Sequence, residues 1–112
     1  MINGGHVIIY SKNADADRAL IRDVLKFKHI GAHGGWLIFK LPPSELAVHP
    51  SDDNDLHEFY LMTDDLDLEI KTLKKAGVEC DPVSQQSWGR STRIPLPGGG
   101  TLGLYEPRHA RP

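Results

Sequence analysis

Two histidines stand at corresponding places in this chain, and both can do chemistry. His6 begins the β-rich run HVIIYS, and His57 begins the similar run HEFYLMT, 51 positions later. An imidazole is the commonest metal ligand in proteins and is also a useful polar group in a pocket wall. Two imidazoles alone hold a divalent ion weakly, because stable sites use three or more protein donors. The pair therefore indicates either part of a metal site or a polar pocket lining.

A glycine interrupts the last β-rich run, TLGLYE. Alternation along this strand places Gly103 on the same face as Thr101 and Tyr105. A glycine inside a strand marks a bend, a bulge or the close approach of another group. The run ELAVH holds the corresponding place in the first half, and aligning the two runs sets Ala47 at the position of Gly103. Neither residue has a side chain that can coordinate a metal or move a proton.

The elements that must position these residues form an internal repeat. Helical spacing of apolar residues predicts helices at 14–27 and 66–76. Eight β-rich runs predict strands, so that each half reads strand, helix and three strands; the runs are 6–11, 28–32, 36–41, 45–49, 57–63, 78–83, 90–96 and 101–106. We therefore predict one domain, 1–112, built of a module at 5–50 and a module at 57–108, joined by the acidic linker 51–56.

Composition narrows the classes of partner. The chain has 112 residues and a formal net charge of −2, so we expect neither nucleic acid nor an anionic membrane as a partner. Its single cysteine suits a reducing compartment. No apolar run approaches the ~20 residues of a membrane span, and the N-terminus lacks the pattern of a signal peptide. We expect a cytoplasmic protein. The short basic tail RHARP, residues 108–112, is predicted to be disordered.

Alternation also predicts which side chains line the inner surface. Thr92, Ile94 and Leu96 should face the helices and Arg93 should face inward, whereas in the run 57–63 Phe59 and Leu61 should face inward. The candidate ligand-binding residues are Trp36, Tyr10, His49, Phe59, Trp88, Arg93 and Tyr105. An aromatic lining with a basic group suits a flat small molecule that carries an acidic group. The alternative is that these aromatic side chains fill a small core.

A family resemblance lies in the paired modules, each opened by a histidine, and in the segments HEFYLMTDDLDLEIKTLKKAGVE, WGR and LYEP. In these features the sequence resembles the vicinal oxygen chelate superfamily of glyoxalases, bleomycin resistance proteins and extradiol dioxygenases. The resemblance implies an α+β fold of two βαβββ modules, with curled mixed sheets, helices outside and a concave inner cleft. Metal-using members take a histidine from the first strand of one or both modules and a glutamate from the last strand of each. His6 and His57 match the histidine positions, but Gly103 and Ala47 stand at the glutamate positions.

Three function classes follow from this resemblance. The first is a metal-free protein that binds a small organic ligand and needs no cofactor, similar to bleomycin resistance proteins. The second is a divergent metal-dependent lyase or dioxygenase that uses His6 and His57, with Glu45 and His49 as further donors. The third is a partner or sensor module that keeps only the fold. The residues leave open whether the chain is an enzyme. The superfamily also implies a homodimer, often with modules exchanged between chains.

Overall fold

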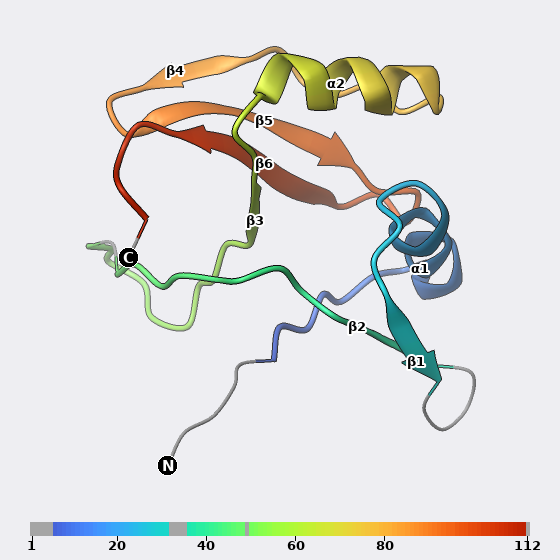
Figure 1. Ribbon diagram of the computed structural model, residues 1–112. Helices are drawn as coiled ribbons and strands as arrows, with labels where there is room; N and C mark the ends of the chain where they lie inside the picture. The colour runs from blue at the N-terminus through green and yellow to red at the C-terminus, as the bar shows by residue number, and fades with distance from the viewer. Residues whose placement is uncertain (1–5, 32–35, 49, 112) are drawn as a thin grey trace.

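The computed structural model describes residues 6–31, 36–48 and 50–111, which form an α+β fold (Figure 1). In chain order the elements are α1 (Ala14–Asp23), β1 (His29–Gly31), β2 (Leu37–Phe39), β3 (Tyr60–Met62), α2 (Leu66–Lys75), β4 (Ser84–Gln86), β5 (Gly89–Pro95) and β6 (Thr101–Pro107). The predicted fold class, with two helices and curled mixed sheets, is confirmed. Within the described residues, only the second half reads strand, helix and three strands.

Both helices begin at side-chain caps. The Asn13 side chain accepts a hydrogen bond from the Ala16 amide at 3.2 Å, and Asp65 accepts one from the Leu68 amide at 3.1 Å. Such caps satisfy amide groups that have no partner within the helix. Helix α1 ends four residues before its predicted end at 27, because the chain turns through a left-handed conformation at Lys26, with φ of 60°. Helix α2 ends within one residue of its prediction.

The larger sheet has four strands in the order β3-β6-β5-β4, and β1 pairs with β2 in a separate antiparallel ribbon. Strands β3 and β6 run parallel, whereas β6, β5 and β4 are antiparallel neighbours. Helix α2 lies on one side of this sheet, and the coil that follows β2 passes on the other side (Figure 1). The sheet therefore has one face covered by a helix and one face turned toward the coil of the first half.

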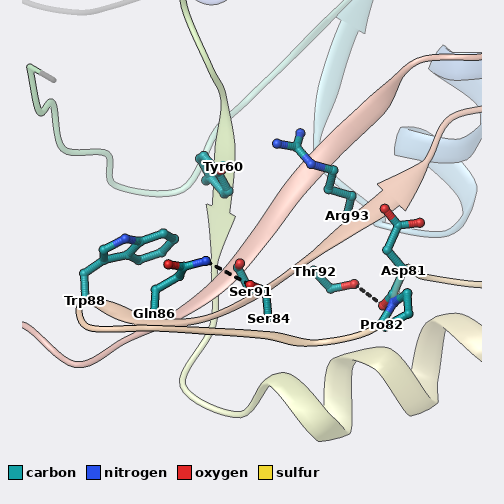
Figure 2. A pocket seen from close by; sticks show the side chains of 9 residues that line it. All are labelled: Tyr60, Asp81, Pro82, Ser84, Gln86, Trp88, Ser91, Thr92 and Arg93. Carbon is teal, nitrogen blue, oxygen red and sulfur yellow. Dashed lines mark hydrogen bonds between the residues drawn. The ribbon is translucent and has the colours of Figure 1, made fainter. Parts of the chain in front are cut away.

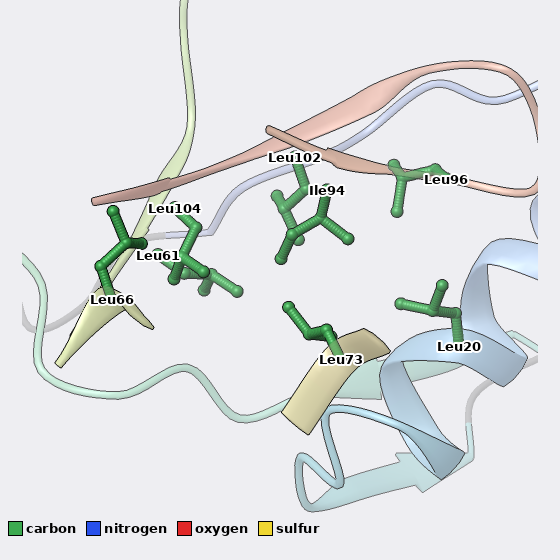
Figure 3. Close-up of a cluster of buried hydrophobic side chains, with 8 residues drawn as sticks. All are labelled: Leu20, Leu61, Leu66, Leu73, Ile94, Leu96, Leu102 and Leu104. Atoms are coloured by element: carbon green, nitrogen blue, oxygen red, sulfur yellow. The ribbon is translucent and has the colours of Figure 1, made fainter. Parts of the chain in front are cut away.

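The hydrophobic core lies between the four-stranded sheet and the helices (Figure 3). Its members are Leu20, Leu61, Leu66, Leu73, Ile94, Leu96, Leu102 and Leu104. Leu20 belongs to α1, so the first helix packs into the core of the second half. The alternation predicted for β5 is confirmed, since Thr92, Ile94 and Leu96 are buried on the helix side. Two leucines of β6, at alternate positions, share that face.

A buried carboxylate also joins the two halves. Asp17 of α1 is only 6% exposed, and its Oδ1 accepts a hydrogen bond of 2.7 Å from the amide of Gly98, in the turn between β5 and β6. The other oxygen, Oδ2, is buried without a hydrogen-bond partner among the described residues. A Cβ atom at position 98 would clash with the Ser11 hydroxyl and lie 3.0 Å from Asp17 Oδ2, so glycine allows this close approach without a shift of the Ser11 side chain. None of the helices in the described part of the chain is long and apolar enough to cross a membrane.

The first half differs from its prediction in its outer strands. Within the described residues, neither 6–11 nor 45–48 forms a strand, and His49 of the predicted run 45–49 lies outside the described residues. Ile8 and Leu46 in these runs are exposed at 61% and 91%. A strand is stable only when paired and packed, and no neighbouring strand pairs with either run. The predicted strand 78–83 is likewise coil, because Val78 and Cys80 pack against the core there and pairing begins at Ser84.

Candidate functional site

Three cross-strand neighbours organise the sheet face that is turned away from α2, which we call the open face. Tyr60 of β3 pairs with Gly103 of β6, and Gly103 pairs with Arg93 of β5. Cross-strand neighbours point to the same side of a sheet, so Tyr60 and Arg93 flank the bare backbone of Gly103. A second row on this face consists of Met62, Tyr105, Ser91 and Ser84.

The ring of Tyr60 occupies the space next to Gly103. A Cβ atom added at Gly103 would lie 2.7 Å from Cε1 and 2.8 Å from Cγ of Tyr60, which is closer than real side chains approach each other. Burial raises the pKa of Tyr60, and the nearby Glu58 carboxylate adds to this effect. Gly103 therefore has two effects. It supplies no carboxylate, and it leaves room for the Tyr60 ring to lie over β6.

A cavity of about 240 Å³ opens on this face (Figure 2). Its lining residues are Tyr60, Asp81, Pro82, Ser84, Gln86, Trp88, Ser91, Thr92 and Arg93. The Arg93 guanidinium is directed toward the side where Tyr60 lies, and the Trp88 ring stands at the turn that joins β4 to β5 (Figure 2). The volume is slightly below the usual range of small-molecule pockets and suits one or two fused rings.

The lining combines one cation with fixed polar groups. Arg93 reaches Thr101 Oγ1 only at 3.5 Å and makes no ion pair within the described residues. The backbone fixes Asp81, whose amide donates to the Arg93 carbonyl at 3.1 Å and whose carbonyl accepts from Thr92 Oγ1 at 2.6 Å. Gln86 Nε2 donates to Ser84 Oγ at 2.9 Å. The guanidinium is therefore available to an acidic group of a ligand.

Three aromatic rings meet beside the cavity. The ring centroids of Tyr60 and Trp88 are 6.2 Å apart, those of Tyr60 and Tyr105 are 5.6 Å apart, and those of Trp88 and Tyr105 are 5.3 Å apart. The interplanar angles of 75°, 88° and 82° give edge-to-face contacts, the favoured arrangement for aromatic pairs. Each ring restricts the other two, so the aromatic end of the cavity has a defined shape.

A carboxylate from the first half reaches this aromatic cluster. The Tyr105 hydroxyl donates a hydrogen bond of 2.8 Å to Glu45 Oε1. Burial, together with the Glu45 carboxylate that accepts this proton, raises the pKa of Tyr105 to about 12. Tyr105 is therefore a hydrogen-bond donor at neutral pH and not a base. Of the two predicted donors of the first half that lie within the described residues, His6 and Glu45, only Glu45 contacts the open face.

The structure brings some predicted ligand-binding residues together and separates others. Trp88 and Arg93 line the cavity, and Tyr105 packs against Trp88. Tyr10 is 90% exposed, and Trp36 is 61% exposed, with the Arg18 guanidinium carbon 5.2 Å from its ring centroid. Neither of them lines the cavity. His49 lies outside the described residues.

The predicted inward direction of Phe59 and Leu61 does not hold, because both pack into the hydrophobic core. The parallel register explains this result. Leu61 pairs with Leu104, which faces the helices, and Tyr60 pairs with Gly103, which does not. The alternation of β3 is therefore shifted by one residue relative to the prediction. Sequence reasoning missed Tyr60 for this reason, although the strand glycine signalled that some group approaches closely at this point.

The donor atoms present do not fit the metal site of the superfamily. Among the described residues, no three His, Cys, Asp or Glu side chains lie close enough together to hold an ion. His6 and His57 are exposed and line neither the cavity nor its aromatic end. Ala47 and Gly103 supply no ligand atom, and the Tyr60 ring fills the space beside Gly103. We therefore derive no chemical step through a metal.

Comparison with known proteins identifies the fold. No protein family matches the sequence, and no curated protein matches it. Solved structures do match, with TM-scores of 0.63 for each of three examples. A lactoylglutathione lyase from Agrobacterium tumefaciens is 17% identical, and the match covers 88% of this chain and 88% of that chain. An antibiotic-binding protein from a Streptomyces species is 22% identical, with coverage of 92% and 99%.

The third example is a member of the glyoxalase/bleomycin resistance protein/dioxygenase superfamily from Sphaerobacter thermophilus. It is 24% identical, and the match covers 94% of this chain and 98% of that chain. The coverage shows that the likeness extends over nearly the whole chain in each protein. The resemblance seen in the sequence is thus confirmed in three dimensions: the chain has the fold of the glyoxalase/bleomycin resistance/dioxygenase superfamily.

Proposed function

We propose that this protein binds a small, flat organic anion in the cavity on the open face and needs no metal to do so. The observation that carries the proposal is that Arg93, whose guanidinium makes no ion pair within the described residues, lines one cavity of about 240 Å³ together with the aromatic rings of Tyr60 and Trp88. A planar ring fits against aromatic walls, and a carboxylate or similar group binds the planar fork of arginine in two places.

Binding without chemistry is favoured by the groups that the cavity lacks. Among the described residues, its lining includes no histidine, cysteine or glutamate, and Asp81 is the one acidic side chain. Tyr60 and Tyr105 hold their protons more tightly than free tyrosine does, so neither is suited to abstract a proton at neutral pH. The fold relative described as an antibiotic-binding protein supports the same class of function. We therefore place the protein among ligand-binding members of this fold.

We further propose that the working unit is a homodimer. Nine large apolar side chains in the described part of the first half are exposed, namely Val7, Ile8, Ile9, Tyr10, Ile30, Trp36, Ile38, Leu46 and Val48. Exposed apolar surface on this scale is uncommon in a protein that stays monomeric. The edge of β3 that does not pair with β6 is a second surface for association. A second copy of the chain would cover the exposed apolar side chains and pair with this edge of β3.

Calorimetric titration tests the proposed site with two matched compounds. Naphthoate carries a fused ring and a carboxylate, whereas naphthamide has the same ring and no charge. We expect naphthoate to bind more tightly than naphthamide, and Arg93→Ala to remove that difference. Arg22→Ala is the control, because Arg22 pairs with Asp23 on the surface of α1 and does not line the cavity. Equal loss of naphthoate binding in both variants, or none in Arg93→Ala, would contradict the proposal.

A further inference from the structure

The C-terminal tail that follows β6 is held in place by specific hydrogen bonds, so its predicted disorder is wrong for residues 108–111. The backbone amide of Arg108 donates to the Trp88 carbonyl at 2.9 Å. The Arg108 guanidinium donates through Nη2 to Gln85 Oε1 at 2.9 Å and through Nη1 to the Gln86 carbonyl at 3.5 Å. One residue of the tail thus contacts the last two residues of β4, Gln85 and Gln86, and Trp88 in the turn that follows.

The next residue of the tail contacts the aromatic cluster. His109 Nε2 lies 3.3 Å from the Tyr105 hydroxyl and 3.6 Å from Glu45 Oε1. Its Nδ1 lies 3.0 Å from the Ala110 carbonyl, and its ring centroid lies 6.1 Å from that of Tyr105. Arg108 and His109, which we call the C-terminal clamp, therefore fix the Trp88 turn from one side and the Tyr105 ring from the other.

The contacts of the C-terminal clamp matter because Trp88 lies both in a turn and in the cavity wall. Trp88 stands in the tight turn between β4 and β5, and its ring is 39% exposed although it forms a wall of the cavity. Residues at exposed turn tips are mobile unless other parts of the chain restrain them. Strand pairing of Gln86 with Gly89 and of Gly89 with Pro107 closes this turn. Beyond that pairing and the ring contacts with Tyr60 and Tyr105, Arg108 holds the turn within the described part of the chain.

We propose that Arg108 and His109 are positioning residues that hold the Trp88 ring in the cavity wall and thereby set the affinity of the site. Neither residue is among the described residues that line the cavity. Arg108 acts directly on the Trp88 turn, and His109 acts on Trp88 through the Tyr105 ring that packs against it. The part of this inference that concerns affinity rests on the proposed function. The part that concerns the placement of Trp88 does not, and it is measured without any ligand.

The experiment uses the full-length chain with Trp36→Phe, so that all tryptophan fluorescence comes from Trp88. In this background Arg108→Ala and Gln85→Ala each remove the same side-chain hydrogen bond from opposite ends. We expect acrylamide to quench Trp88 more strongly in both variants than in the parent. We also expect naphthoate to bind about tenfold more weakly, the change that corresponds to loss of one charge-assisted hydrogen bond of about 1.4 kcal/mol.

Arg111→Ala is the matched control. Arg111 is an arginine of the same tail, but it pairs with Asp64 at 3.2 Å and makes no contact with the Trp88 turn. It should leave both the quenching and the affinity near the parent values. Unchanged quenching in Arg108→Ala and Gln85→Ala, with far-UV circular dichroism like that of the parent, overturns the clamp even if naphthoate binds. If the parent itself binds no naphthoate, the proposed function fails, and the quenching result alone decides whether the clamp exists.

Discussion

The aromatic ring of Tyr60 lies over the backbone of Gly103, its cross-strand neighbour, and the two residues share a space that would otherwise hold a side chain of β6. This relationship connects the absent carboxylate with the shape of the cavity, because the same ring covers the strand and lines the cavity wall. The absence of a side chain at Gly103 and the position of the Tyr60 ring therefore depend on each other.

A methyl group at position 103 should disturb both stability and binding. In Gly103→Ala the Tyr60 ring must move, and forced repacking of this kind typically costs about 1–3 kcal/mol. Gly100→Ala is the control on the same hairpin, since a Cβ there meets nothing within 4 Å. Urea denaturation should separate the two variants. If Gly103→Ala were as stable as Gly100→Ala, the Tyr60 ring could move away from position 103 at no cost, which would contradict this prediction.

Metal content follows from the same geometry. The purified protein should carry far less than one divalent ion per chain by elemental analysis, and added zinc or manganese should raise its Tm little. Gly103→Glu should not create a tight site, because the Tyr60 ring takes up the room beside the backbone. Stoichiometric metal that disappears when His6 and His57 are both replaced by alanine would contradict this prediction.

Tyr105 should titrate late in alkali. Its pKa is raised from 10.0 to about 12 by burial and by Glu45, so the folded protein holds this proton more tightly than the unfolded chain does. The contribution of this group to stability is complete below a pH of about 10 and is lost as the pH rises toward about 12. Tyrosinate absorbance should show Tyr105 ionising late, well above the ordinary tyrosine value.

The Tyr105→Phe variant provides the comparison. It should lose the late step and show a weaker fall in stability across the same alkaline range. Glu45→Gln should shift the late step to lower pH, because the carboxylate charge contributes to the raised pKa. Simultaneous ionisation of all three tyrosines near the ordinary value would be inconsistent with the hydrogen bond between Tyr105 and Glu45.

The buried carboxylate of Asp17 should matter through its hydrogen bond and not through its charge. Asp17→Ala leaves the Gly98 amide without its acceptor, which typically costs about 1–3 kcal/mol. Asp17→Asn keeps an acceptor oxygen and replaces the second carboxylate oxygen, which has no hydrogen-bond partner among the described residues. It should be at least as stable as the parent. Urea unfolding of the two variants checks this order, and an asparagine variant as unstable as the alanine variant would refute it.

Association should depend on the first half. Light scattering at micromolar concentration should give the mass of two chains, and Leu46→Ser should shift the protein toward monomer because this leucine is 91% exposed. Leu68→Ser is the matched control, since Leu68 is 57% exposed on α2 in the second half. A monomer at every concentration, or equal effects of the two substitutions, would count against the dimer.

Most of the second half of the fold could be read from sequence, apart from the run 78–83, because its signals are local and consistent. Asp65 caps α2, Gly77 ends it with φ of 85°, and the alternation of β5 places Ile94 in the core. The first half gave equally clear β-rich runs, yet two of them form no strand in the described residues. Strand formation depends on a pairing partner, and sequence patterns do not reveal whether one is present.

The candidate site shows the same limit. Arg93 and Trp88 follow from alternation and composition, whereas Tyr60 follows only from the register of β3 on β6. A shift of one residue in register moves every side chain to the other face, which is why Phe59 and Leu61 were assigned to the cavity and Tyr60 was not. The Glu45 contact with Tyr105 joins positions 60 residues apart, and no local pattern encodes it.

The hydrogen bond between Asp17 and Gly98 spans 81 positions of the chain, and it sets an order of events during synthesis. The ribosome releases α1 well before the hairpin that receives it, because the two are separated by 81 positions. Helix α1 must therefore wait, with its core leucine unburied, until the chain has been made as far as this hairpin. Long-range contacts of this kind slow folding and prolong the exposure of apolar surface. A nascent chain of this protein should depend on chaperones more than its small size suggests.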